Sequence, residues 1–218
     1  MSDITMTRDT ASEDAPAEQA RGGAMASTMK ARRAMIDSQL RTSGVNEEFA
    51  LSRMMAVPRE DFLPADKAGL AYIDRSVPLG TDAALAPPLF YGKLLIEGAP
   101  QPSDDVLIVE GGTGYLAELV RPLAGNIAEV SAQDAARGNL PEGAFTLVLI
   151  DGAVERLPDA LAETVVEDGR VVSGLVLRGV TRLASGRKVA GYLALEPLED
   201  LGIPVLHAFD QPKGWTFS

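Results

Sequence analysis

A glycine-rich turn between an apolar run and a helical pattern constrains the fold of this chain more than any other feature. Residues Val106–Val109 lead into Gly111-Gly112-Thr113-Gly114, and a helical pattern follows over Tyr115–Leu123. A strand, a tight glycine turn and a helix in this order open the α/β folds that bind nucleotides, because glycine lets the backbone turn sharply and approach a ligand closely. The pattern therefore predicts an α/β protein.

The remaining elements follow from apolar periodicity and from proline and glycine punctuation. Apolar runs typical of buried strands cover residues 127–131, 145–150, 170–177 and 189–195. Helical patterns cover residues 28–44, 46–57, 88–96 and 158–166. The last two apolar runs, 205–209 and 215–217, predict an antiparallel pair that closes the sheet.

Three regions follow from this pattern. Residues 1–27 are rich in Ala, Thr, Ser, Asp and Glu without an apolar period, which predicts a disordered acidic leader. Residues 28–104 form a helical N-terminal region whose second half is rich in loops and prolines. Residues 105–218 form the α/β core.

Composition excludes several classes of function. The chain has 31 acidic and 20 basic residues and a net charge of −11, which argues against binding to duplex nucleic acid or to an anionic membrane. It has no cysteine and one histidine, His207, so disulfides, thiolate nucleophiles and His-rich or Cys-ligated metal sites are not expected. It contains neither an apolar run of membrane-spanning length nor a secretory signal pattern. We expect a soluble cytoplasmic protein.

Several segments, in the same order along the chain, resemble the protein-L-isoaspartate O-methyltransferase family. They are residues 31–41, 57–64 (Val-Pro-Arg-Glu-Asp-Phe-Leu-Pro), 106–115, 149–153 and 167–172. The resemblance implies a Rossmann-like class I methyltransferase fold that binds S-adenosylmethionine (SAM). It also implies transfer of a methyl group to the α-carboxylate of an isoaspartyl residue in a damaged protein.

The cofactor cradle departs from the pattern that the resemblance implies. Glu110 stands at the first glycine position, and Ile108 stands where an acidic residue is expected. A carboxylate beside the methionyl carboxylate of SAM would repel it by about 1 to 4 kcal/mol, depending on the dielectric constant. The alternative is a turn shifted in register, in which Glu110 replaces the missing acid. The candidate cofactor residues are Glu110, Gly111, Gly112, Thr113, Gly114 and Glu129.

The chain between the glycine turn and the next buried strand is short. Only 30 residues separate Gly114 from Phe145. The resemblance implies a second strand, a crossover helix and a third strand in this interval, and a parallel crossover alone needs about a dozen residues. We therefore expect a shortened sheet that lacks one βα unit. Glu129 or Asp134 is either the ribose-binding acid that the resemblance implies or a solvated carboxylate.

The loop expected to hold the substrate also departs from the family pattern. Ala84 and Ala86 stand where hydroxyl residues are expected, and neither can donate a hydrogen bond. Thr81 is the nearby hydroxyl, and Asp82 adds a negative charge. Asp151, at the end of a buried strand, either faces a substrate or caps the next turn. The catalytic candidates are thus Thr81, Asp82 and Asp151.

Two functions remain open from the sequence. The first is a degenerate family member, impaired in SAM binding and methylation, that acts as a binding or scaffolding pseudoenzyme. The second is an active SAM-dependent protein carboxyl methyltransferase with a rebuilt cofactor pocket. A protein partner or a homodimer through the strand at 127–131 is the expected interaction, because a shortened sheet exposes that strand edge. Arg59 either binds an anionic group or pairs with Glu60 or Asp61.

Overall fold

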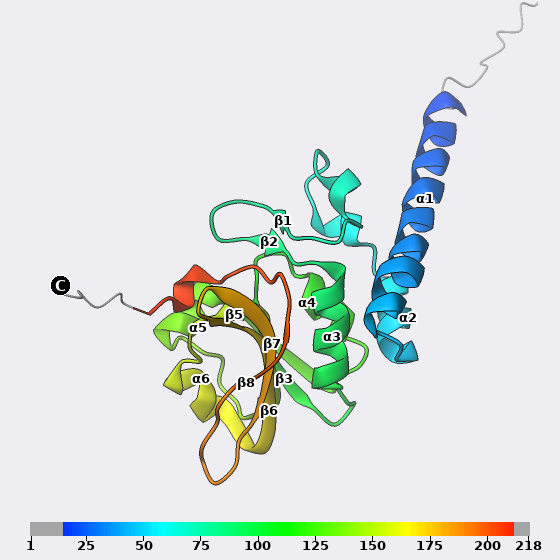
Figure 1. Ribbon diagram of the computed structural model, residues 1–218. Helices are drawn as coiled ribbons and strands as arrows, with labels where there is room; N and C mark the ends of the chain where they lie inside the picture. The colour runs from blue at the N-terminus through cyan, green and yellow to red at the C-terminus, as the bar shows by residue number, and fades with distance from the viewer. Residues whose placement is uncertain (1–14, 212–218) are drawn as a thin grey trace, which may run out of the picture.

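The computed structural model describes residues 15–211 and shows a mixed sheet with helices on both faces (Figure 1). The six strands lie in the order β4-β3-β5-β6-β7-β8. Neighbours are parallel from β4 to β6, and β7 and β8 are antiparallel additions. The strands are β3 (Asp105–Glu110), β4 (Asn126–Ser131), β5 (Phe145–Val154), β6 (Val165–Leu177), β7 (Val180–Arg187) and β8 (Glu196–Asp200). This is the α/β fold that the glycine turn predicts, in the Rossmann-like form that the family resemblance implies.

Alternating side chains of the central strands form two hydrophobic cores, one on each face of the sheet. On β3, Val106 and Ile108 face the core under α2 (Glu48–Ala56), α3 (Pro88–Gly98) and α4 (Tyr115–Val120). Leu107 and Val109 face the other core, which α5 (Ala132–Arg137) and α6 (Asp159–Thr164) cover. Because both faces are covered, these strands are continuously apolar, as parallel strands commonly are.

The N-terminal region is helical over a longer stretch than the sequence pattern predicts. Helix α1 (Ala15–Met35) continues into a π-helical turn, η1 (Ile36–Leu40), and a 3₁₀ turn, η2 (Arg41–Ser43). Gly44 ends this run in the left-handed conformation that favours glycine. Residues 15–27, for which composition predicts a disordered leader, are therefore helical, and residues 1–14 lie outside the described part. In Figure 1 the start of α1 extends away from the sheet.

The shortened sheet is confirmed. Between Gly114 and Phe145 the chain forms only α4, β4 and α5, and β5 then pairs directly with β3. Strand β4 has its predicted position and is the end strand of the sheet. Pairing of a second copy with this free edge remains a prediction.

The C-terminal part differs from the predicted strands. Residues 189–195 are not a strand: Ala190 and Gly191 have φ of +51° and +79°, and Val189 and Tyr192 close a tight turn through backbone hydrogen bonds of 2.9 and 3.0 Å. In place of the predicted closing pair, Val205 makes a single parallel bridge to Ala153, and residues 207–209 form the 3₁₀ turn η5 (His207–Phe209). Residues 215–217 lie outside the described part. Within residues 15–211, no helix combines the length and apolarity needed to cross a membrane.

A buried ion pair fastens the end of α3 to the amino ends of the central strands. Arg170 of β6 donates to Asp104 at 2.6 Å and to the carbonyls of Gly98 and Ala99 at 2.7 and 3.1 Å. Thr146 also donates to Asp104, at 2.7 Å. Burial by itself would raise the pKa of Asp104, but the hydrogen bonds from Arg170 and Thr146 outweigh it and lower the pKa.

Replacing Asp104 with asparagine lowers the free energy of unfolding by about 3 kcal/mol at pH 7, because it leaves a largely buried guanidinium without its counter-charge. The difference in free energy of unfolding between the wild type and this variant shrinks as the pH falls through the lowered pKa of Asp104. Protonation then removes the same charge from the wild type. Urea unfolding at pH 7 and pH 3 measures both effects. Asp200→Asn is the control, because the carboxylate of the Arg182–Asp200 pair is 67% exposed, and it loses less than about 1 kcal/mol. Equal losses in the two variants would contradict the prediction.

Candidate functional site

The candidate site lies at the carboxyl ends of β3 and β5, where α/β folds place their ligands. Strand β5 pairs with β3 up to Ile150, and its ladder with β6 on the other side is irregular between Leu149 and Ala153. Beyond this point, residues 204–206 take the place of β3 beside Ala153, which donates to the Pro204 carbonyl at 2.7 Å. Asp151 is the first residue after the split. Such irregularities redirect a side chain, and this one opens a space above the sheet.

The glycine turn packs tightly against its surroundings. A Cβ on Gly111 would collide with the backbone oxygen of Asp151, and one on Gly112 would lie 2.7 Å from the Cβ of Ala83. Gly112 and Gly114 also have φ of +93° and +73°. The amide of Ala84 donates to the Gly111 carbonyl at 3.3 Å, so the loop at residues 80–84 rests on the turn. The glycines are therefore needed for the packing of the turn itself.

Glu110 directs its carboxylate back into the turn. Its Oε2 accepts a hydrogen bond from the Gly114 amide at 2.9 Å. Its Oε1 is buried and has no hydrogen-bond partner among the described residues. Burial raises the pKa of Glu110, and the Gly114 amide only partly offsets this. The Glu110 carboxylate thus accepts the hydrogen bond of the Gly114 amide, and Gly114 is one of the candidate cofactor residues.

The end of β4 carries a serine beside the turn. The β3–β4 register pairs Glu110 with Ser131. Ser131 caps α5, accepting from the Asp134 amide at 3.0 Å and donating to the Asp134 carboxylate at 2.8 Å. Glu129 lies two residues earlier and accepts from Arg121 at 3.0 Å. The two acids considered for ribose binding are therefore engaged within the protein, and the last position of the strand has no acid.

Asp151 is buried, and its carboxylate makes no hydrogen bond of regular geometry. Its relative exposure is 2%, and neither oxygen has such a bond among the described residues, although Tyr91 and the Gly111 amide lie close enough to lower its pKa in part. Burial, and after it the negative charge of Glu110, raise the pKa of Asp151 to about 7. Asp151 therefore does not cap the next turn, which was one of the two expected roles. The other expected role, facing a substrate, stays a prediction.

A cavity of about 160 Å³ brings the three catalytic candidates together. Thr81, Asp82 and Asp151 all line it, together with Gly111 of the turn and His207 of η5. His207 is exposed and contacts Asp210 at 2.9 Å. Ala84 also lines the cavity, whereas Ala86 is fully buried and is not among its lining residues. Over the part of the chain that the structure describes, no group of three or more metal-ligating side chains is present.

Comparison with known proteins agrees with this architecture. A family model described as "Protein-L-isoaspartate(D-aspartate) O-methyltransferase (PCMT)" matches residues 30–131. A protein-L-isoaspartate O-methyltransferase of Koribacter versatilis is 31% identical over 193 residues, which cover 78% of this chain and 87% of the relative. The chain belongs to the protein-L-isoaspartate O-methyltransferase family.

Other members support the assignment. Protein-L-isoaspartate O-methyltransferase 2 of an Anaeromyxobacter species is 29% identical over 188 residues, covering 75% of this chain and 77% of the relative. A crystal structure from Plasmodium falciparum, described as a putative protein-L-isoaspartate O-methyltransferase in complex with S-adenosyl-L-homocysteine, shares the fold. Its TM-score is 0.62 at 16% identity, covering 82% of this chain and 97% of that one.

The segment 57–64, one of those that carry the family resemblance, places a charged residue in the core. Arg59, in η3 (Arg59–Phe62), has no exposed surface and donates to the carbonyls of Ala71 and Ala86 at 2.6 and 2.7 Å. Its guanidinium lies over the rings of Tyr91 and Tyr115, 5.4 and 5.1 Å from their centres. The predicted pairing with Glu60 or Asp61 is wrong, because Glu60 pairs with Arg32 at 3.2 Å. No pattern in the sequence indicates that these two aromatic rings lie against Arg59.

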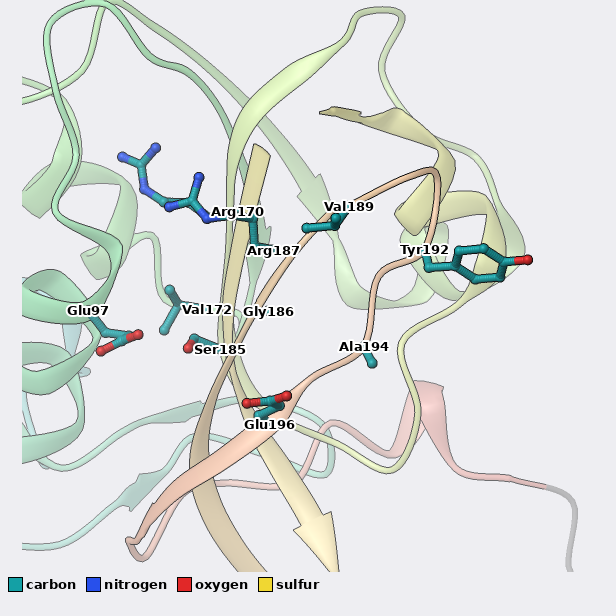
Figure 2. Close-up of a pocket in the computed structure, with 10 residues that line it drawn as sticks. All are labelled: Glu97, Arg170, Val172, Ser185, Gly186, Arg187, Val189, Tyr192, Ala194 and Glu196. Carbon is teal, nitrogen blue, oxygen red and sulfur yellow. The ribbon is translucent and has the colours of Figure 1, made fainter. Parts of the chain in front are cut away.

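A larger cavity, of about 520 Å³, lies at the opposite end of the sheet (Figure 2). Its lining mixes Glu97 and Glu196 with Arg170 and Arg187. Arg170 is held by Asp104, and Arg187 donates to the Asp168 carbonyl at 2.6 Å. Tyr192, whose side chain is exposed, also lines this cavity (Figure 2). Both arginines of this cavity therefore already have partners within the protein.

Proposed function

We propose that this family member has lost SAM binding and isoaspartyl methylation and acts as a binding or scaffolding protein. The observation that carries the proposal is the 2.9 Å hydrogen bond from the Gly114 amide to the Glu110 carboxylate. The family, and the relative whose structure is described with S-adenosyl-L-homocysteine, imply SAM as the cofactor. The residues present here do not fit it.

The misfit starts at the glycine turn. The methionyl carboxylate of the cofactor would have to displace Glu110 or lie beside it. At about 4 Å, two such charges repel by roughly 1 kcal/mol in water and 4 kcal/mol at an effective dielectric constant of 20. This corresponds to a tenfold to nearly thousandfold loss of affinity. Ser131 at the end of β4 and the missing βα unit remove further contacts on the adenosine side.

The substrate side is equally unsuited to an isoaspartyl carboxylate. Asp82 and Asp151 line the cavity over the turn, and Glu110 lies beneath it. An anionic substrate would meet these acidic groups with Thr81 as the nearby hydroxyl, since Ala84 and Ala86 offer no donor on their side chains. Charge repulsion and the lack of donors both disfavour the usual substrate of the family.

Calorimetric titration of the full chain with SAM, and separately with S-adenosylhomocysteine, tests the loss of cofactor binding. We expect no saturable heat up to about 1 mM ligand. Glu110→Gly, which removes both the charge and the side chain, raises the residual affinity at least about tenfold. Glu142→Gln, which removes an exposed acid remote from the turn, leaves affinity unchanged. Saturable binding of SAM by the wild type would overturn the proposal.

A second candidate is an active SAM-dependent protein carboxyl methyltransferase with a rebuilt pocket. The unpartnered Oε1 of Glu110 favours it, since this oxygen could accept a hydrogen bond from the amino group of a bound ligand. Transfer of labelled methyl groups to an isoaspartyl peptide distinguishes the two candidates. If the wild type incorporates label and Glu110→Gln does not, the protein is an active methyltransferase. If neither incorporates label, the result supports the binding or scaffolding function.

A further inference from the structure

Buried polar atoms without partners gather at one place in the described part of the chain. Among all the described residues, six side-chain atoms are buried and lack a hydrogen bond. Five of the six belong to Arg59, Glu110, Tyr115 and Asp151. Folded proteins satisfy nearly all buried polar groups, so such a concentration indicates that something further binds there.

Asp151 is the member of this group that opens into a cavity. Both of its oxygens are unpartnered, and it lines the 160 Å³ space described above. If one water-sized group takes about 30 Å³, the space holds about five non-hydrogen atoms. Apolar and backbone surfaces make up much of the remaining wall, from Pro78, Ala83, Ala84, Pro204, Val205 and Leu206. The cavity thus combines a buried acceptor with a wall suited to methylene groups.

The charges around the cavity favour a cation. Asp82 lines it with Asp151, and Glu110 contributes negative charge from below. No lysine or arginine is among its lining residues. The positive charge of the Arg59 guanidinium also acts on Asp151, but less than the charge of Glu110, and this guanidinium is held by two carbonyls and lies over two aromatic rings. A metal ion does not fit, because no group of three or more metal-ligating side chains occurs in the described residues.

We infer that the Asp151 cavity binds an alkylammonium group. Its N–H groups donate hydrogen bonds to the Asp151 carboxylate, and its methylenes pack on residues 204–206. The group has the required charge, the donors that Asp151 lacks and a short apolar stem. Its source is either a free small amine or a lysine side chain of another protein. The inference rests on the proposed function, because it gives the cleft a ligand other than the reactants of methyl transfer.

Calorimetric titration of the full chain at pH 8 with n-butylammonium tests the inference. Butyrate, of similar size and opposite charge, and neutral n-butanol are the matched ligands. We expect saturable binding of butylammonium and at least tenfold weaker binding of the other two. Asp151→Asn weakens butylammonium binding at least tenfold, whereas Asp82→Asn, at an exposed position, weakens it two- to threefold.

Equal affinity for butylammonium and butanol, or unchanged affinity in Asp151→Asn, would overturn the inference and leave water as the occupant. Nα-acetyl-lysine methylamide separates the two sources: binding at least as tight as that of butylammonium assigns the cavity to a lysine side chain, and tenfold weaker binding assigns it to a free amine. The SAM titration is independent of this test. Failure of butylammonium therefore rejects only the inference, and binding of SAM rejects the proposed function.

Binding of the amine also depends on pH. The groups that face Asp151 are Glu110 from β3, Tyr91 from α3, Arg59 from η3, and Asp82 and His207 across the cavity. Because the pKa of Asp151 is about 7, its ionised fraction rises about tenfold from pH 6 to pH 8, and the affinity for butylammonium rises accordingly. His207→Gln retains this rise and Asp151→Asn loses it. A pH dependence that disappears with His207 instead would contradict the role of Asp151.

Discussion

Replacing Asp151 with asparagine raises the free energy of unfolding by about 4 kcal/mol at pH 8 and leaves it nearly unchanged at pH 4. The folded-state pKa of about 7 lies above the ordinary value of 3.8, because burial and the charge of Glu110 disfavour the ionised form. Between these two values the folded chain holds a proton that the unfolded chain has lost, so wild-type stability falls as the pH rises. Each unit of difference corresponds to about 1.4 kcal/mol.

Urea unfolding at several pH values between 4 and 8 measures this effect. The wild type loses stability across the range relative to Asp151→Asn, and the two curves converge at the acidic end. Asp82→Asn is the control: it removes an exposed carboxylate from the same cavity and changes stability by no more than about 0.5 kcal/mol. If the free energy of unfolding of the wild type and of Asp151→Asn changed with pH in parallel, ionising the buried carboxylate would not destabilise the folded state, which would contradict the prediction. Saturating butylammonium at pH 8 reduces the difference, if the inferred site exists.

Replacing Arg59 with methionine lowers the free energy of unfolding by about 3 to 5 kcal/mol. The side chain has no exposed surface and holds two otherwise separate loop segments through the carbonyls of Ala71 and Ala86. Methionine retains much of the volume but leaves both carbonyls without these donors and removes the cation from the faces of Tyr91 and Tyr115. Arg59→Lys recovers only part of the loss, because a compact ammonium lacks the planar fork of donors.

Arg53→Met is the matched control for this variant. Arg53 also donates to two carbonyls, those of Leu119 and Glu118 at 3.0 and 2.9 Å, but it is only half-buried. Water replaces its hydrogen bonds, so we expect a loss of about 1 kcal/mol. Chemical unfolding of the three variants and the wild type provides the comparison. A loss for Arg59→Met no larger than that for Arg53→Met would contradict a structural role for the buried cation.

Where local pattern and packing require the same element, the sequence predicted it closely. The apolar run before the glycine turn became β3, and residues 127–131 became β4 with the addition of Asn126. Counting residues between Gly114 and Phe145 also predicted the missing βα unit, because chain length limits what a crossover can contain. The predicted strand at 189–195 was wrong, since backbone geometry at Ala190 and Gly191 bends the chain where hydropathy indicates extension.

The sequence by itself determined the order of elements from β3 to β6, the shortened sheet, the family resemblance and the unusual position of Glu110. These follow from periodicity, spacing and residue identity, which act locally along the chain. Only the tertiary structure decided that Glu110 turns back to Gly114, that Arg59 lies over the rings of two tyrosines, and that Asp151 shares a cavity with residues 81, 82 and 207. Burial and charge at these positions depend on neighbours brought together from distant segments, and hydrogen-bond satisfaction is decided by that packing alone.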